Sequence, residues 1–163
     1  MNAIFLDIDG VLNCDGTPNP RDLPYIVDQK LLRRFHRLVK ASEAIVILTS
    51  SWRIDPVGLY AARYWKIPFD ATCPDMLDVP RREEILSWLQ KHPRITRYVV
   101  IDDEDDGLDD LPLFQTSSKT GLTREICRGV LSYLNGKTNK VMRANLVTRV
   151  IENMGAVFHR NKD

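Results

Sequence analysis

Three short apolar runs, each followed by polar or acidic side chains, constrain the fold of this chain more than any other feature of its sequence. They cover residues 3–6, 44–48 and 98–101. Their apolar residues are continuous rather than alternating, which is typical of strands buried on both faces of a parallel sheet. Between the runs lie segments whose apolar residues follow helical spacing. Strands that alternate with helices predict a parallel sheet with right-handed crossovers.

Four segments have this helical spacing, and most of them are bounded by residues that start or stop helices. We expect helices over about residues 29–40, 83–91, 123–134 and 140–155, with a short fourth strand at 113–115. The predicted fold class is therefore α/β: a three-layer sandwich with a mostly parallel, Rossmann-like sheet and helices on both faces.

Length and composition predict a single domain. The chain has 163 residues, which lies within the usual range for one domain and suffices to bury a substantial core. We expect one domain over residues 1–163, with a core over about residues 1–135 and the last helix as an addition. A hydrophobic content of 44% and a formal net charge of +1 exclude a disordered chain and an overall basic nucleic-acid binder.

The sequence also bears on the compartment. No apolar run approaches the roughly 18 residues that a membrane span needs, and the N-terminal segment lacks the basic start of a secretory signal. The 3 cysteines are far apart and form no CxxC pair, which disfavours a disulfide framework and a structural zinc site. We therefore expect a cytoplasmic protein with no membrane association.

Chemically active side chains follow each of the three apolar runs. They are Asp7 and Asp9, Thr49 and Ser50, and Asp102 and Asp103. Acids after a single strand are as often part of a solvated loop as of a site. In an open parallel sheet, however, ligands bind beyond the carboxyl ends of the strands, where all three groups are predicted to meet. The coincidence favours a functional site at this edge.

Several carboxylates in one crevice are unfavourable unless a cation neutralises them. A hard divalent ion with oxygen ligands fits, and Mg²⁺ is typically held by one or two carboxylates, water and phosphate oxygens. No histidine lies near these acids, which disfavours zinc. Mg²⁺ beside a carboxylate suits phosphoryl transfer, in which one Asp attacks phosphorus and a second moves the proton.

The same residues resemble a known enzyme family. The segment FLDIDGVLN at residues 5–13 is similar to the DxDGxxN signature of the haloacid dehalogenase (HAD) superfamily of phosphohydrolases. Residues 48–50 resemble its second motif, residues 100–103 its fourth, and Arg81 is the best match to its third. The combination with EEILSWL and FQTSSKTGLT resembles, more narrowly, the small HAD domains of Swiss Army Knife RNA repair proteins. The resemblance extends to about residue 134.

The resemblance implies a role for each site residue. Asp7 would be the nucleophile and Asp9 the general acid/base, while Thr49, with Ser50 as its neighbouring substitute, would bind the phosphoryl group. The metal would be held by Asp7, the backbone carbonyl of Asp9, and Asp102 or Asp103. The cation that steadies the phosphate would be Arg81, with Arg82 and Lys119 as alternatives. Many relatives have Lys at this position, and Arg keeps the charge with a different geometry.

The resemblance also bears on the substrate. The intervals between motifs are too short for a folded cap domain, and an open site suits a large substrate such as a polynucleotide end. Trp52 and Arg53 follow the second motif, where they would stack on a base and bind phosphate, although packing is the more common role of Trp. We expect a Mg²⁺-dependent phosphatase acting on a nucleotide or nucleic-acid end. The alternatives are a phosphoserine/phosphothreonine protein phosphatase and a non-catalytic binding domain.

The C-terminal third leaves two questions open. Beyond residue 118 the chain is rich in Lys and Arg, which is either an electrostatic footprint for nucleic acid or the solvated faces of two helices. The apolar stripe of the last helix must pack on the sheet or on a second copy of the chain. The expected state is therefore a monomer or a homodimer through this helix.

Overall fold

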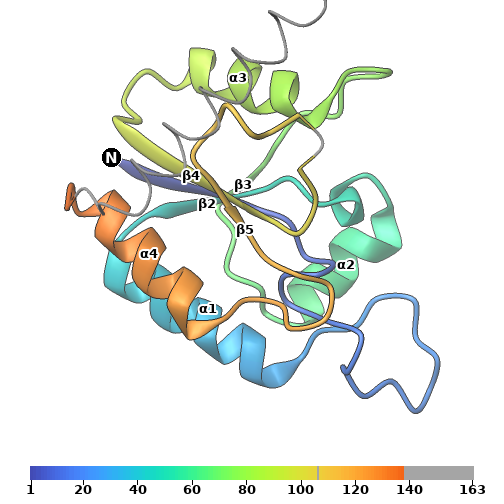
Figure 1. Ribbon diagram of the computed structural model, residues 1–163. Coiled ribbons are helices and arrows are strands. Elements are labelled where there is room, and N and C mark those ends of the chain that lie inside the picture. Colours follow the sequence, from blue (N-terminus) through green and yellow to red (C-terminus); the bar gives the residue numbers. More distant parts are fainter. Residues whose placement is uncertain (106, 138–163) are drawn as a thin grey trace, which may run out of the picture.

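A computed structural model describes residues 1–105 and 107–137 (Figure 1). The helix expected at about 140–155, and the dimer contact and most of the basic residues assigned to that region, lie outside the described residues. The elements in chain order are β1 (Asn2–Leu6), α1 (Gln29–Ser42), β2 (Ile45–Leu48), the 3₁₀ turn η1 (Ser51–Arg53), α2 (Pro56–Tyr64), β3 (Ala71–Thr72), α3 (Arg81–Lys91), β4 (Arg97–Asp102), β5 (Leu113–Gln115) and α4 (Arg124–Leu134).

The sheet has five strands in the order β3-β2-β1-β4-β5, and every neighbouring pair is parallel. The predicted parallel α/β fold is confirmed. β1 lies at the centre because its residues 3–6 are fully buried on both faces. Leu6 pairs with Leu48 on one side and with Ile101 on the other. The residues after these three therefore leave the sheet together at its carboxyl edge.

Alternate residues of β1 point to opposite layers. Ile4 and Leu6 belong to the larger core, which also takes in buried residues of α1, α2 and α4, while Ala3 and Phe5 belong to a second core with α3 (Figure 1). Burying a large side chain such as Ile4, Leu6 or Phe5 contributes about 1.5–3 kcal/mol relative to leaving it exposed. The helices thus cover both faces, and the sheet edge between them remains for the site.

Side chains at the start of the helices fix where they begin. Asp28 accepts hydrogen bonds from the first backbone N–H groups of α1, and the Thr123 hydroxyl accepts one from the Ile126 N–H at 3.2 Å. α2, which the sequence analysis missed, is capped by Asp55 and has Pro56 at its first position. α3 begins at Arg81 directly after Pro80, two residues earlier than expected. Arg81 therefore lies at the N-terminus of a helix.

The intervals between the motifs hold no additional domain within the described residues. The stretch between β1 and α1 is a loop, and the stretch between η1 and α3 contains α2 and the two-residue β3. This matches the expectation that no cap domain is present. None of the helices in residues 1–105 and 107–137 combines the length and the apolar character that crossing a membrane requires.

Candidate active site

Three carboxylates meet at the carboxyl edge of the sheet. Asp7 directly follows β1, and its N–H extends the sheet ladder by donating to the Ile101 carbonyl at 3.0 Å. Asp102 ends β4, the neighbouring strand, and Asp103 follows it. Carboxylate oxygens of Asp7, Asp102 and Asp103 lie within 4.8 Å of one another. Asp102 and Asp103, at the end of β4, therefore lie close to Asp7 at the end of β1, as the sequence predicted.

Gly10 makes room for this cluster. Its φ is +66°, a backbone conformation that favours glycine, and a Cβ built there would lie 2.1 Å from the carboxylate of Asp103. The Thr116 hydroxyl donates to the Gly10 carbonyl at 2.8 Å, which ties the turn to the end of β5. The glycine of the DxDG motif is thus explained by the close approach of the β4 loop.

Arg81 is the cationic candidate that the structure brings to the cluster. Its guanidinium donates to Asp102 Oδ2 and lies 3.3 Å from Asp7 Oδ1. Arg82, one residue on, points elsewhere and forms a bidentate pair with Asp110 at 2.5–3.0 Å. Lys119 is exposed in the loop after β5. Of the three candidates from the sequence, Arg81 is the one placed against the predicted nucleophile.

Burial and repulsion between neighbouring acids raise the pKa values of Asp7 and Asp102. The pKa of Asp7 rises from 3.8 to about 8, mainly because the carboxyl is buried and secondly because Asp102 lies beside it. Arg81 opposes this rise but does not cancel it. Burial likewise raises the pKa of Asp102. For Asp7, the repulsion by Asp102 thus exceeds the opposing effect of Arg81, and the carboxylate oxygens of the cluster are donors that fit a divalent cation such as Mg²⁺.

Thr49 supplies a hydroxyl with no competing partner. It follows β2, is fully buried, and its Oγ1 has no hydrogen-bond partner within residues 1–105 and 107–137. Ser50, also buried, instead caps η1, because its Oγ accepts a bond from the Trp52 N–H at 3.4 Å. A buried unpartnered hydroxyl is unfavourable, and such groups are candidates for contact with a ligand or water. Thr49 thus fits the predicted phosphoryl contact better than Ser50.

The side chain of Asp9 is not among the three carboxylates that meet within 4.8 Å, and it is exposed. Its Oδ1 accepts a hydrogen bond from Asn13 Nδ2 at 2.8 Å, and its Oδ2 accepts one from Trp52 Nε1 at 2.8 Å. Trp52 is only 2% exposed, so its ring is not available to stack on a base in this arrangement. In the structure, Trp52 instead forms a hydrogen bond with Asp9, the predicted acid/base residue.

Arg53 is also directed inward rather than toward a substrate. Its guanidinium donates to the Cys73 carbonyl at 3.0 Å and to Glu84 Oε2 at 2.5 Å, and it also bonds the Thr49 carbonyl. The side chain is 5% exposed. The expected phosphate contact is therefore replaced by contacts that join the turn after β2 to α3. The role of Glu84 could not be predicted from the sequence, because a helical pattern does not indicate an ion pair with a residue 31 positions away.

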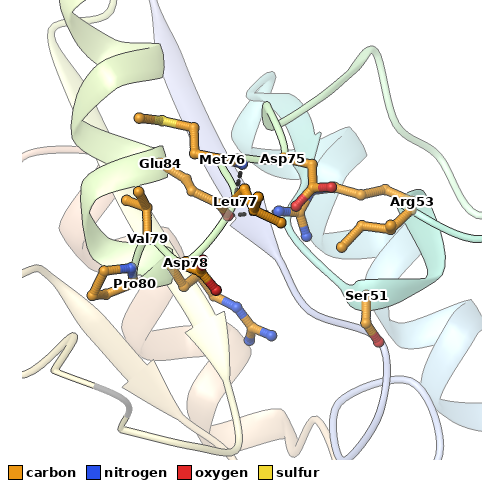
Figure 2. A pocket seen from close by; sticks show the side chains of 11 residues that line it. Ser51, Arg53, Asp75, Met76, Leu77, Asp78, Val79, Pro80 and Glu84 are labelled. Carbon is orange, nitrogen blue, oxygen red and sulfur yellow. Dashed lines mark hydrogen bonds and ion pairs between the residues drawn. The ribbon is translucent and has the colours of Figure 1, made fainter.

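A shallow hollow of about 440 Å³ opens beside Arg81. Figure 2 shows it between η1 and the segment before α3, with Leu77 and Met76 among its apolar side chains and Asp75 and Asp78 among its acidic ones. This hollow could not be predicted from the sequence, because the segment at residues 73–80 has neither strand nor helix periodicity. The hollow adjoins the catalytic candidates and offers space for part of a substrate.

A family model identifies the kind of domain that this chain forms. A family model described as "HAD domain in Swiss Army Knife RNA repair proteins" matches residues 3–127. A solved structure titled "Structure of Pnkp1/Rnl/Hen1 complex" is similar with a TM-score of 0.44 and 20% identity, over 72% of this chain and 46% of that chain. The present chain thus spans less than half of that chain. A search of curated proteins found no match.

Proposed function

The chain belongs to the family of HAD domains in Swiss Army Knife RNA repair proteins, and from this premise we propose that it is a phosphomonoester hydrolase. The proposed reaction depends on Mg²⁺, passes through an aspartyl-phosphate on Asp7, and releases phosphate from a nucleotide or nucleic-acid end. The family supports a phosphoesterase related to RNA repair. The Mg²⁺ requirement, the aspartyl-phosphate intermediate and the nucleic-acid substrate go beyond what the family supports.

The single observation that carries this proposal is the meeting of three carboxylates, those of Asp7, Asp102 and Asp103, at the carboxyl edge of the sheet, with Asp7 and Asp102 buried. Three carboxylates within 4.8 Å of one another form an unfavourable arrangement for structure alone. Their oxygen donors fit Mg²⁺, and Asp7, Asp102, Asp103 and the backbone carbonyl of Asp9 are the groups that would hold it. When bound, the ion would offset negative charge on these acids and on a phosphate.

Each remaining step is assigned to a side chain of this protein. A carboxylate oxygen of Asp7 attacks phosphorus, and the bond between phosphorus and the leaving oxygen breaks. Asp9 gives its proton to that oxygen, then accepts a proton from the water that attacks phosphorus and frees Asp7. Arg81, 3.3 Å from Asp7, and the unpartnered Thr49 hydroxyl would stabilise the charge on the transferring group.

The hollow beside Arg81 supports a specific place for the leaving group. It is open rather than enclosed by a second domain, and it adjoins the arginine that contacts Asp7. A substrate that extends beyond the reacting phosphate would have space there. This is consistent with a nucleotide or oligonucleotide end, in which the phosphate is attached to a large group.

The direct test is phosphate release from a panel of 5′- and 3′-phosphorylated oligonucleotides, mononucleotides and phosphopeptides. We expect release from the nucleic-acid ends with Mg²⁺, and none after chelation or from Asp7→Asn. Turnover restricted to phosphopeptides would replace the nucleic-acid substrate with a protein one. A folded protein with no turnover on any member of the panel would contradict the enzyme assignment and favour a binding domain.

A further inference from the structure

The proposed acid/base residue is held at both of its oxygens. Asn13 Nδ2 donates to Asp9 Oδ1, and Trp52 Nε1 donates to Asp9 Oδ2, both at 2.8 Å. Asp9 is an exposed residue, so packing around its side chain contributes little to its orientation. Two donors on two different oxygens fix the plane of a carboxylate, whereas one donor leaves it free to rotate about that contact.

The tryptophan that makes one of these contacts is itself immobilised. Trp52 is 2% exposed, and its ring meets Tyr25 edge-on with centroids 4.9 Å apart and an interplanar angle of 69°. The Tyr25 hydroxyl donates to Asp55, the residue that caps α2. Gly58 of α2 lies against the Trp52 backbone, where a Cβ would be 2.7 Å from its carbonyl oxygen. The indole is therefore anchored through the turn after β2 and the start of α2.

We propose that Trp52 is a positioning residue, whose indole N–H holds Asp9 in the orientation that delivers a proton to the leaving oxygen. The proposal rests on the proposed phosphatase function. The indole nitrogen only donates, so it leaves Asp9 Oδ2 with a lone pair for the transferred proton. Asn13 holds the other oxygen, and both contacts come from residues with no direct role in the attack on phosphorus. A loss of orientation slows proton transfer and leaves the nucleophile intact.

The substitution Trp52→Phe separates this role from packing. Phenylalanine keeps an aromatic ring against Tyr25 and removes the N–H. Proton donation matters most when the leaving group is a poor one, such as a ribose hydroxyl, and least for p-nitrophenolate. We therefore expect kcat for an end-phosphorylated oligonucleotide to fall about 10- to 100-fold, with a much smaller loss for p-nitrophenyl phosphate. KM should stay close to the wild-type value.

The matched control is Trp65→Phe. Trp65 Nε1 donates to the Tyr25 carbonyl at 3.1 Å, so this variant also removes one indole hydrogen bond near the same tyrosine, but not one to Asp9. We expect its kcat to remain near wild type on both substrates. In an Asp9→Asn background, Trp52→Phe should cause no further loss on the oligonucleotide. Equal losses on both substrates, or a full additional loss in that background, would overturn the positioning role.

A second readout does not depend on turnover. In a ¹H–¹⁵N spectrum, the resonance missing from Trp52→Phe identifies the Trp52 indole N–H, and Asp9→Ala should shift this resonance more than that of Trp65. An unmoved Trp52 resonance would overturn the contact. If the wild-type protein releases no phosphate, the proposed function is overturned, and the role of Trp52 in proton delivery with it. If the wild-type protein is active but Trp52→Phe lowers kcat equally on both substrates, the positioning role alone is overturned.

Discussion

Two groups of charged side chains lie near the N-terminus of α3, and they differ in composition: one pairs a single acid with a single arginine, and the other brings three acids together beside one arginine. Arg53 and Glu84 form a 2.5 Å ion pair with side chains 5% and 6% exposed. The guanidinium also donates to the backbone carbonyls of the turn after β2, and Glu84 Oε1 accepts a bond from the Met76 N–H at 2.9 Å. Among the acids around Asp7, by contrast, the repulsion exceeds what Arg81 offsets.

This difference separates a charged pair that holds structure from a charged cluster suited to a ligand. The Arg53–Glu84 pair joins the turn after β2 to α3 and has its donors and acceptors matched, as buried charges require. The acidic cluster includes an Asp7 whose pKa is raised to about 8. Thr49, whose hydroxyl has no hydrogen-bond partner among the described residues, follows the neighbouring strand β2. The first group should therefore govern stability, and the second should govern activity.

The largest expected effect is on activity, at the acidic cluster. Asp7→Asn removes the nucleophile and should lower kcat by more than about 10⁴-fold, a scale typical of losing a nucleophile. Because it also removes a buried carboxyl with a raised pKa, the metal-free variant should be at least as stable as wild type near neutral pH. Phosphate release measures the loss of kcat, and urea unfolding measures the stability of the variant. Wild-type turnover by a folded Asp7→Asn protein would remove the distinction between the clusters.

The next largest effect is on stability, at the paired cluster. Glu84→Gln leaves the buried Arg53 without its counter-charge, and breaking such a pair costs about 3–5 kcal/mol. Urea unfolding measures the loss. The matched control is Glu125→Gln, since Glu125 pairs with Arg128 at 2.6 Å on the surface, where the loss should be much smaller. Similar losses in the two variants would show that the buried pair contributes no special stability.

A smaller effect is expected when Mg²⁺ is added to chelator-treated protein. At a free concentration of 100 times its dissociation constant, an ion that binds the folded state alone raises the free energy of unfolding by about 2.7 kcal/mol. Asp103→Asn should require a higher Mg²⁺ concentration for the same gain. Asp110→Asn, which changes an acid paired with Arg82 outside the cluster, should respond as wild type does. Thermal unfolding with and without Mg²⁺ gives the comparison.

The most gradual effect is the pH dependence of the metal-free protein, because it is spread over several pH units. The pKa of Asp7 is 3.8 in its ordinary state and about 8 in the fold. Between these values the folded state binds a proton that the unfolded state has released, so stability falls as pH rises, by up to about 1.4 kcal/mol per pH unit. Asp7→Asn should flatten this part of the unfolding profile. An equally steep profile in the variant would assign the dependence to other groups.

The sequence was sufficient to predict the features that depend on local patterns. Continuous apolar runs predicted β1, β2 and β4, and because parallel strands share a carboxyl edge, they also predicted that Asp7 and Asp102 meet. α2 was missed because several of its apolar residues are exposed and Gly58 interrupts its pattern. β3 has two residues, too few for any periodicity, and forms through pairing with β2.

The parts of the site that could not be predicted depend on contacts between distant residues. The motif placed Trp52 beside the catalytic candidates, but its hydrogen bond to Asp9 joins residues 43 positions apart. The choice among Arg81, Arg82 and Lys119 followed from where α3 begins, since Pro80 sets Arg81 at the helix terminus facing Asp7. Arg53 was expected to bind phosphate because it follows the second motif. The turn that directs its side chain inward has no signature in the sequence.

The most direct test of the central claim is to trap the phosphoryl group on the protein. Wild-type protein would be mixed with a ³²P end-labelled oligonucleotide and Mg²⁺, quenched in acid within the first turnover, and digested for peptide mapping. The account predicts label on the peptide that contains Asp7 in the wild-type protein, with none in Asp7→Asn. Phosphate release by wild-type protein with no label on the Asp7 peptide at any quench time would contradict it.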